Sequence, residues 1–443
     1  MDTIATLYAL LALPMTLMFA LLTPPFQIPD ELDHYLYARM LTEGQALPVQ
    51  LPGGGAGGAV RAGDLALFKT FANLPFRYEE KVSAQAFQGA NIIREGASIQ
   101  NDFSGAAIYP PTAYAVPALG LAVADAMGAS RLVAFYGGRA ANALAFVGMA
   151  TIALCVLPVS KGAFAFVLLL PMTLSQAGSF SADAHVFGVT AIICALLARE
   201  SLCAPRALVL TVVAAMILMV ALTKAPMVAL LLPLAALSWR HSKALAAVLT
   251  IGVLAAFAVW TLEFVLTEAQ AARSARLGNV SATDQLDFLL SSPFSVFTVA
   301  WGTLTANLTF YYQSMVGRFG WLDAPMALWF YWLAGLSFAV TAGASALETK
   351  ALPHGLAFAL SAIVSATLTF GALYLSWTPV GAGIVVGVQG RYFIPVLLPA
   401  VIALAGLARM PINPLFAFTP AVLLWGAAAV HAPLVLVFRY YLR

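Results

Sequence analysis

The sequence predicts an all-α polytopic membrane protein. Of its 443 residues, 62% are hydrophobic and only 9% are charged, whereas soluble domains carry roughly 25% charged residues. Apolar stretches long enough to cross about 30 Å of hydrocarbon recur along the chain, for example residues 4–23, 140–160, 244–262, 324–347 and 410–430. This composition excludes a soluble protein, and no basic patch points to a nucleic-acid partner.

The first apolar stretch predicts a retained membrane helix. It lacks the basic segment that begins a signal peptide, and Thr23-Pro24-Pro25 after it is a poor cleavage site. The three cysteines fall within or at the ends of apolar helices, so we expect neither a disulfide framework nor a thiolate metal site.

Two long polar segments interrupt the single domain that we expect over residues 1–443. Residues 24–108 hold 15 charged residues and residues 267–325 hold 7. They predict a first aqueous loop over residues 24–130, with juxtamembrane helices, and a second over residues 267–325. Within the first loop, the glycine-rich run over residues 52–58 is expected to be a flexible excursion, because glycine runs order poorly.

Short basic clusters set the predicted orientation, because Lys and Arg concentrate in cytoplasmic loops. The clusters are Arg199 with Arg206, Arg240 with His241 and Lys243, Lys350 with His354, and Arg409. Crossings counted from them place both long loops, Asp183, Lys224 and residues 376–391 on the periplasmic side. If residues 109–127 also crossed the membrane, the first loop and Asp183 would lie on opposite sides. We therefore expect residues 109–127 to form a juxtamembrane or re-entrant helix. About 11 crossings remain, with the N-terminus inside and the C-terminus outside.

The strongest candidate for chemistry follows the first apolar stretch, in Pro29-Asp30-Glu31-Leu32-Asp33-His34-Tyr35. Asp30, Asp33 and His34 share one helical face by their spacing, and Glu31 pairs with Tyr35 on another. Clustered carboxylates raise one another's proton affinity, which suits a general base or a metal site. The alternative is an ordinary helix start, where acidic residues complement the helix dipole.

Asp183 is a second candidate, because it is the only acid between Asp125 and Glu200. Isolated acids at membrane depth are functional candidates by default. The alternative is an N-cap at a membrane boundary, and one residue can serve both purposes.

Solitary cations, Lys224 and Arg391, lie at the outer ends of long apolar segments and could hold a phosphate. Arg391 is the only Lys, Arg, Asp or Glu between Lys350 and Arg409, and it follows a glycine-rich, aromatic approach. The alternative for both is snorkelling to lipid headgroups. Arg139, in Gly137-Gly138-Arg139-Ala140-Ala141-Asn142, is a weaker version of the same pattern.

Arg318 and Asp323 flank Trp321 where the second loop returns to the membrane. They could bind substrate, or they could anchor the loop at the membrane interface. The sequence contains no His/Glu zinc signature, phosphate-binding glycine loop or nucleophile elbow, so the chemistry of soluble enzymes is not expected.

Six motifs in this order resemble the bacterial membrane family known as domain of unknown function 2142, which in turn resembles the GT-C glycosyltransferases. The similarity covers about residues 20 to 400, and the last two motifs are the most specific. The motifs are Pro29-Asp30-Glu31 with His34, Tyr109-Pro110-Pro111, Ser181-Ala182-Asp183, Lys224-Ala225-Pro226, Gly317-Arg318-Phe319-Gly320-Trp321-Leu322-Asp323 and Gln389-Gly390-Arg391-Tyr392-Phe393-Ile394-Pro395.

The resemblance implies a GT-C-like bundle in a bacterial inner membrane, with an active site that faces the periplasm. A polyprenyl-phosphate sugar would be the donor, and an envelope glycan or lipid would be the acceptor. Asp30 and Glu31 match the catalytic acid at the start of the first outer loop, and Asp183 matches a second acid. Substrate contacts are expected from His34, Tyr109, Arg139, Lys224, Arg318, Asp323, Arg391 and Tyr392.

We take Asp30 as the base of an inverting transfer, with Glu31 or Asp183 orienting the acceptor or the base. No cofactor is identified; a divalent metal, with His34 as a candidate ligand, stays open but is not required by the pattern. The alternatives are a transporter or flippase of lipid-linked glycans and a non-catalytic scaffold that binds them. A transporter should carry polar residues at mid-membrane depth, whereas the middles of these helices are almost free of charge.

Overall fold

A computed structural model describes residues 2–52, 54–263, 279–348, 350–408, 410 and 413–442. Within these residues the chain is mostly helical, which confirms the predicted class of polytopic membrane protein. Arg409, assigned above to a cytoplasmic cluster, lies outside the described residues, as does the start of the second loop.

Seven described helices are long and apolar enough to cross a membrane, or up to eight if one bent pair counts as a single span. The seven are α1 (Thr3–Leu22), α7 (Arg131–Val156), α10 (Asp183–Leu202), α13 (Lys243–Trp260), α17 (Leu328–Ala346), α18 (Gly355–Ser376) and α20 (Pro414–Tyr440). The bent pair is α15 (Ala282–Ser291) with α16 (Ser295–Val316), which meet at 113°.

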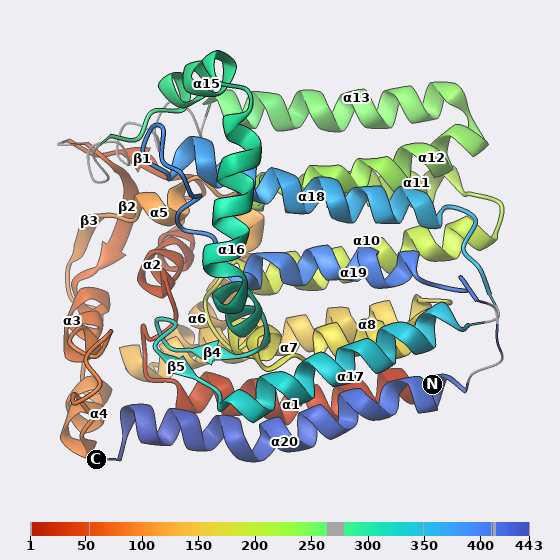
Figure 1. Cartoon of the computed structure of the whole chain (residues 1–443). Coiled ribbons are helices and arrows are strands. Elements are labelled where there is room, and N and C mark those ends of the chain that lie inside the picture. Colours follow the sequence, from red (N-terminus) through yellow and green to blue (C-terminus); the bar gives the residue numbers. More distant parts are fainter. Residues whose placement is uncertain are drawn as a thin grey trace.

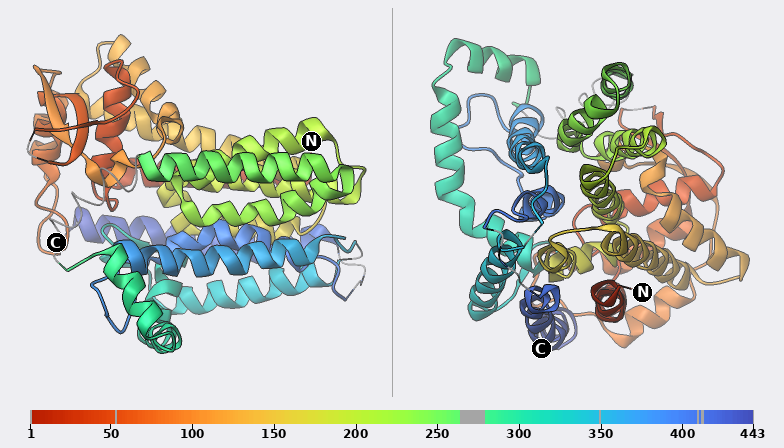
Figure 2. Two further views of the ribbon diagram at one scale, coloured as in Figure 1. Left: turned by 90° about the horizontal axis from the view of Figure 1, so that it is seen from above. Right: turned by 90° about the vertical axis from the view of Figure 1, so that its right-hand side faces the viewer.

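Shorter helices complete the bundle beside these spans. They are α6 (Ala115–Ala126), α8 (Lys161–Leu168), α9 (Pro171–Ala177), α11 (Ala207–Thr223), α12 (Leu231–His241) and α19 (Ile394–Ala403), with the 3-10 segments η2 (Ala225–Leu230) and η4 (Gly390–Phe393). Most bundle helices run in a common direction, whereas α16 runs across them (Figure 1). The same crossing is visible from the other sides (Figure 2).

The first polar segment folds as a cap on one end of the bundle. It contains α2 (Glu31–Thr42), β1 (Val49–Gln50), β2 (Ala56–Arg61), α3 (Ala62–Phe71), α4 (Ala84–Asn91), β3 (Ser98–Asp102), α5 (Ser104–Ala107) and the 3-10 turn η1 (Pro111–Ala113). We call this end, which also holds the C-terminus, the site end (Figure 1, left). The N-terminus lies at the opposite end.

The end of the glycine-rich run is ordered, which the flexible excursion predicted from its composition did not include. Its last three residues, 56–58, lie in β2, which pairs antiparallel with β1 and β3 in a three-stranded sheet. A Cβ on Gly57 would lie 1.9 Å from the backbone oxygen of Asn101. One on Gly58 would lie 2.4 Å from Met40 Sδ. Gly57 is therefore needed for the close approach of β2 to β3, whereas at Gly58 the flexible Met40 side chain can move aside.

Residues 109–127, expected to lie at the membrane surface, contain the helix α6. With 12 residues, α6 is about 18 Å long, which is too short to cross the hydrocarbon. Its Asp125 is bonded to Arg39 and, at 3.2 Å, to Arg131. Arg39 also contacts the buried Asp64, at 3.2 Å. This buried network ties the cap to α6 and α7, so Asp125 is neutralised by protein groups.

A second small sheet, β4 (Arg318–Phe319) with β5 (Ala324–Pro325), lies between α16 and α17.

Candidate functional site

Four charged side chains from distant parts of the sequence meet at the site end. Lys224 Nζ lies 3.1 Å from Asp183 Oδ1, and Arg391 Nε lies 3.6 Å from Asp183 Oδ2. Arg391 Nη2 lies 3.7 Å from Asp30 Oδ2. The convergence expected from the sequence is therefore present: Asp183 bridges two cations, and one of those cations reaches Asp30.

Asp30 is held in an uncommon backbone conformation. Its φ of 63° and ψ of 9° lie in the left-handed region, which costs most residues other than glycine about 1 to 3 kcal/mol. It stands at the N-cap of α2, yet its side chain makes no capping hydrogen bond. The side chain is 57% exposed, whereas those of Asp183 and Arg391 are 4% and 3% exposed. Its carboxylate is thus available to a ligand beside a buried arginine.

Aromatic rings surround the two cations. Lys224 Nζ lies 4.6 Å from the centre of the Tyr392 ring and 5.8 Å from that of Tyr109. The Arg391 guanidinium lies 5.4 Å from the Tyr392 ring. Such contacts favour a cation, more strongly where water is excluded, so both tyrosines help to hold the positive charges in place.

His34 borders the same cluster as a neutral imidazole. Its Nδ1 lies 2.7 Å from the Tyr114 hydroxyl oxygen, and its ring stacks on Tyr109 at 6.0 Å. Burial lowers the pKa of His34 to about 4, an effect that Asp30 and Asp183 only partly oppose. At neutral pH this residue accepts or donates hydrogen bonds without carrying charge.

Gln176 is a member of the site that the sequence did not reveal. Its Oε1 accepts a hydrogen bond of 2.8 Å from Arg391 Nη1, and the side chain is buried. Gln176 belongs to the short helix α9 and carries no charge, so the search for isolated ionisable residues passed over it.

Glu31 and Arg139 form a separate buried pair. Arg139 Nε and Nη2 donate to the two carboxylate oxygens of Glu31 at 2.8 and 2.6 Å. Both side chains are fully buried. Neither makes a polar contact with Asp30, Asp183, Lys224 or Arg391 among the described interactions.

Arg318 and Asp323 bond to different partners rather than to each other. Arg318 Nη1 donates to Gln313 Oε1 at 3.2 Å, and Asp323 pairs with Arg439 at 2.7 Å. Arg439 also donates to the Leu74 carbonyl oxygen. These contacts fasten the second polar segment and the C-terminal helix to the cap, outside the four-residue cluster.

The predicted common face of Asp30, Asp33 and His34 is not formed as a ligand set. Asp33 Oδ2 accepts from the Gly105 backbone N–H at 3.2 Å, while His34 contacts Tyr114. Among the described residues, no group of three or more His, Cys, Asp or Glu could hold a metal ion.

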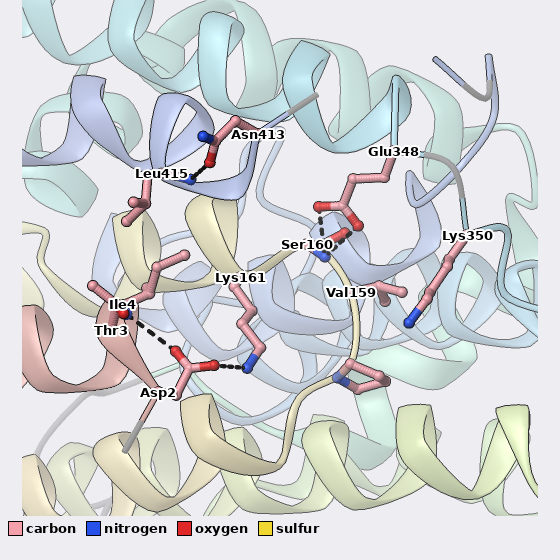
Figure 3. Close-up of a pocket in the computed structure, with 11 residues that line it drawn as sticks. Asp2, Thr3, Ile4, Val159, Ser160, Lys161, Glu348, Lys350, Asn413 and Leu415 are labelled. Atoms are coloured by element: carbon pink, nitrogen blue, oxygen red, sulfur yellow. Dashed lines mark hydrogen bonds and ion pairs between the residues drawn. The ribbon is translucent and has the colours of Figure 1, made fainter. Parts of the chain in front are cut away.

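A cavity of about 390 Å³ lies at the opposite end of the bundle and contains none of the predicted site residues. Two of its acids are already bonded within the protein (Figure 3). Asp2 pairs with Lys161, and both Glu348 oxygens accept from the Ser160 backbone N–H at 2.9 and 2.8 Å.

The fold and the site define a polytopic membrane protein with an ionised cluster at one end of its helix bundle. The chain belongs to the family described as predicted membrane protein (DUF2142), whose sequence model matches residues 13–400. This confirms the family membership that the six motifs predicted. No curated protein and no solved structure matches the chain.

Proposed function

We propose that the protein is an inverting glycosyltransferase of the GT-C type. It would move a sugar from a polyprenyl-phosphate donor to an envelope glycan or lipid acceptor on the periplasmic face of the bacterial inner membrane. The observation that carries the proposal is the exposed Asp30 carboxylate, 3.7 Å from a buried arginine that also contacts Asp183.

The proposed reaction needs a base and a site for an anionic leaving group. Asp30 takes the proton from an acceptor hydroxyl as that oxygen attacks the anomeric carbon. The bond from the anomeric carbon to the phosphate oxygen breaks, and polyprenyl phosphate departs with the electron pair. Arg391 and Lys224 stabilise the added negative charge, because fixed cations act strongly where water is scarce.

Asp183 keeps the two cations in place before the donor binds. It lies 3.1 Å from Lys224 and 3.6 Å from Arg391, so it reduces their mutual repulsion. Gln176 Oε1 accepts a hydrogen bond from Arg391 Nη1 and helps to fix its guanidinium. The two cations would then form an anion subsite next to the exposed Asp30 carboxylate, which is the arrangement that sugar transfer from a lipid phosphate requires.

The proposal includes 11 crossings, with the site end outside. They are α1, α7, α8 with α9, α10, α11, η2 with α12, α13, α17, α18, η4 with α19, and α20. The N-terminus and the C-terminus lie at opposite ends of the bundle (Figure 1). The number of crossings must therefore be odd. We assign α16 to the outer membrane surface, because it runs across the others.

The test is a transfer assay with purified protein and labelled polyprenyl-phosphate sugars. We expect Asp30→Asn to lower kcat about 10²- to 10⁴-fold, the usual contribution of a general base. Glu200→Gln is the matched control, because Glu200 is buried and paired with Arg206 at the opposite end. Wild-type kcat in Asp30→Asn would refute the assignment of the base. A flippase or a binding scaffold would leave the label on its original lipid.

A further inference from the structure

One motif of α7 has no role in the proposed reaction so far: Gly137-Gly138-Arg139-Ala140-Ala141-Asn142. Its Arg139 uses every N–H group of its guanidinium in a hydrogen bond. Arg139 donates to Glu31 through Nε and Nη2, and to the carbonyl oxygens of Ala20, Thr23 and Pro24. A guanidinium has five N–H groups, and five bonds are present. Arg139 therefore joins the end of α1 to the start of α2, where Asp30 lies.

The same motif also holds the segment that leads to Asp183. Glu31 Oε1 accepts from the Phe180 backbone N–H at 3.2 Å, so the pair reaches this segment directly. One helical turn after Arg139, Asn142 Nδ2 donates to the Ser179 carbonyl oxygen at 2.7 Å. A Cβ on Gly138 would lie 2.4 Å from the Phe180 ring, so only glycine lets this ring pack on α7.

We infer that the Arg139–Glu31 pair is a positioning device that sets the places of Asp30 and Asp183 relative to Arg391. This inference rests on the proposed function for the role of Asp30 as base. Glu31 itself has both oxygens bonded and no exposed surface, so it acts through its neighbours and touches no substrate. Because Asp30 lies in the left-handed region, it needs a fixed neighbour to stay there.

Two conservative variants test this in the transfer assay. Arg139→Lys keeps the charge but has three donors instead of five, and Glu31→Gln keeps the shape but loses the charge. We expect each to lower kcat about 100-fold, the cost of a displacement of about 1 Å, with KM for the donor lipid changed less than about threefold. Glu200→Gln again serves as the control.

A double variant separates positioning from general structural damage. If the pair acts through Asp30, adding Arg139→Lys to Asp30→Asn lowers kcat by a clearly smaller factor than adding it to the wild type, because part of its effect passes through Asp30. Full additivity, or wild-type kcat in both single variants, would overturn the inference. If Arg139→Lys fails to fold, Glu31→Gln and Asn142→Ala carry the same comparison.

A second readout does not depend on sugar transfer. Asp30→Cys, in a chain with Cys155 and Cys203 replaced by alanine, can be labelled with a soluble maleimide. Adding Glu31→Gln should release the segment and change the labelling rate several-fold. An unchanged rate would overturn the positioning role whatever the activity. Conversely, if the wild-type protein shows no transferase activity while Glu31→Gln still changes the labelling rate of the Asp30→Cys protein, the proposed function alone is refuted.

Discussion

Asp30 shows at the scale of one residue how this site differs from ordinary structure. A carboxylate at an N-cap normally bonds to the first N–H groups of its helix, yet the Asp30 side chain does not. It combines a left-handed backbone with an exposed carboxylate, although neither feature stabilises α2. Four other described residues that are not glycine share the left-handed backbone, so the feature that favours a role toward a ligand is the exposed carboxylate beside Arg391.

His34 gives a prediction about pH. Its pKa is about 4 in the folded protein and about 6.5 in an unfolded chain. As pH falls through 6.5 the unfolded chain takes up a proton that the folded protein excludes, so stability decreases between pH 6.5 and 4. The loss reaches on the order of 3 kcal/mol at the acid limit. The apparent melting temperature, measured between pH 7 and 4.5, should fall less in His34→Gln than in the wild type.

The exposed His241, at the opposite end, provides the control for this experiment. His241→Gln should leave the acid sensitivity as it is in the wild type. Equal acid sensitivity in His34→Gln and wild type would contradict the burial of a neutral imidazole at the site.

At the scale of one element, β2 depends on its glycines. We predict that Gly57→Ala destabilises the cap by about 2 kcal/mol or more, because the new methyl group meets the Asn101 carbonyl oxygen at 1.9 Å. Gly89→Ala in α4 is the control, because nothing lies within 4 Å of its added Cβ. Helix propensity makes that change neutral or stabilising, by up to about 1 kcal/mol. Thermal unfolding in detergent compares the two, and equal effects would refute the close packing of β2.

The charged site residues could be predicted from the sequence, whereas the strand β2 could not. Ionised side chains are costly inside a membrane and must find partners, so isolated Asp183, Lys224 and Arg391 predicted a common site before any contact was known. Composition alone could not distinguish a flexible glycine run from a strand whose glycines allow contact, because that depends on β3, about 40 residues away.

The same limit applies to Glu31 and Arg139. The resemblance implied catalysis for Glu31 and substrate contact for Arg139, and the sequence did not reveal that the two side chains bond to each other. Which acid faces the ligand depends on backbone angles: Asp30 turns outward and Glu31 inward, although they are adjacent. Gln176 lacked a charge that would have drawn attention to it.

At the scale of the whole molecule, charge is distributed unequally between the two ends. The cavity that Cys203, Arg240 and His354 line places two basic side chains at the opposite end. The acids Asp30 and Asp183 lie at the site end, where their negative charge is balanced by Lys224 and Arg391. By the positive-inside rule, the short basic loops at the opposite end support the proposal that this end faces the cytoplasm and the site end faces outside.

Two thiols report this orientation directly. Cys203 is exposed at the opposite end, and Glu80→Cys would place a thiol on the exposed surface of the cap. With Cys155 replaced by alanine, a membrane-impermeant maleimide should label position 80 in intact spheroplasts and Cys203 only after lysis. If the two ends face different compartments, as proposed, the two thiols differ in their access to the reagent. Labelling of both from outside would contradict the 11-crossing topology, and the reverse pattern would put the anion subsite in the cytoplasm, away from a periplasmic acceptor.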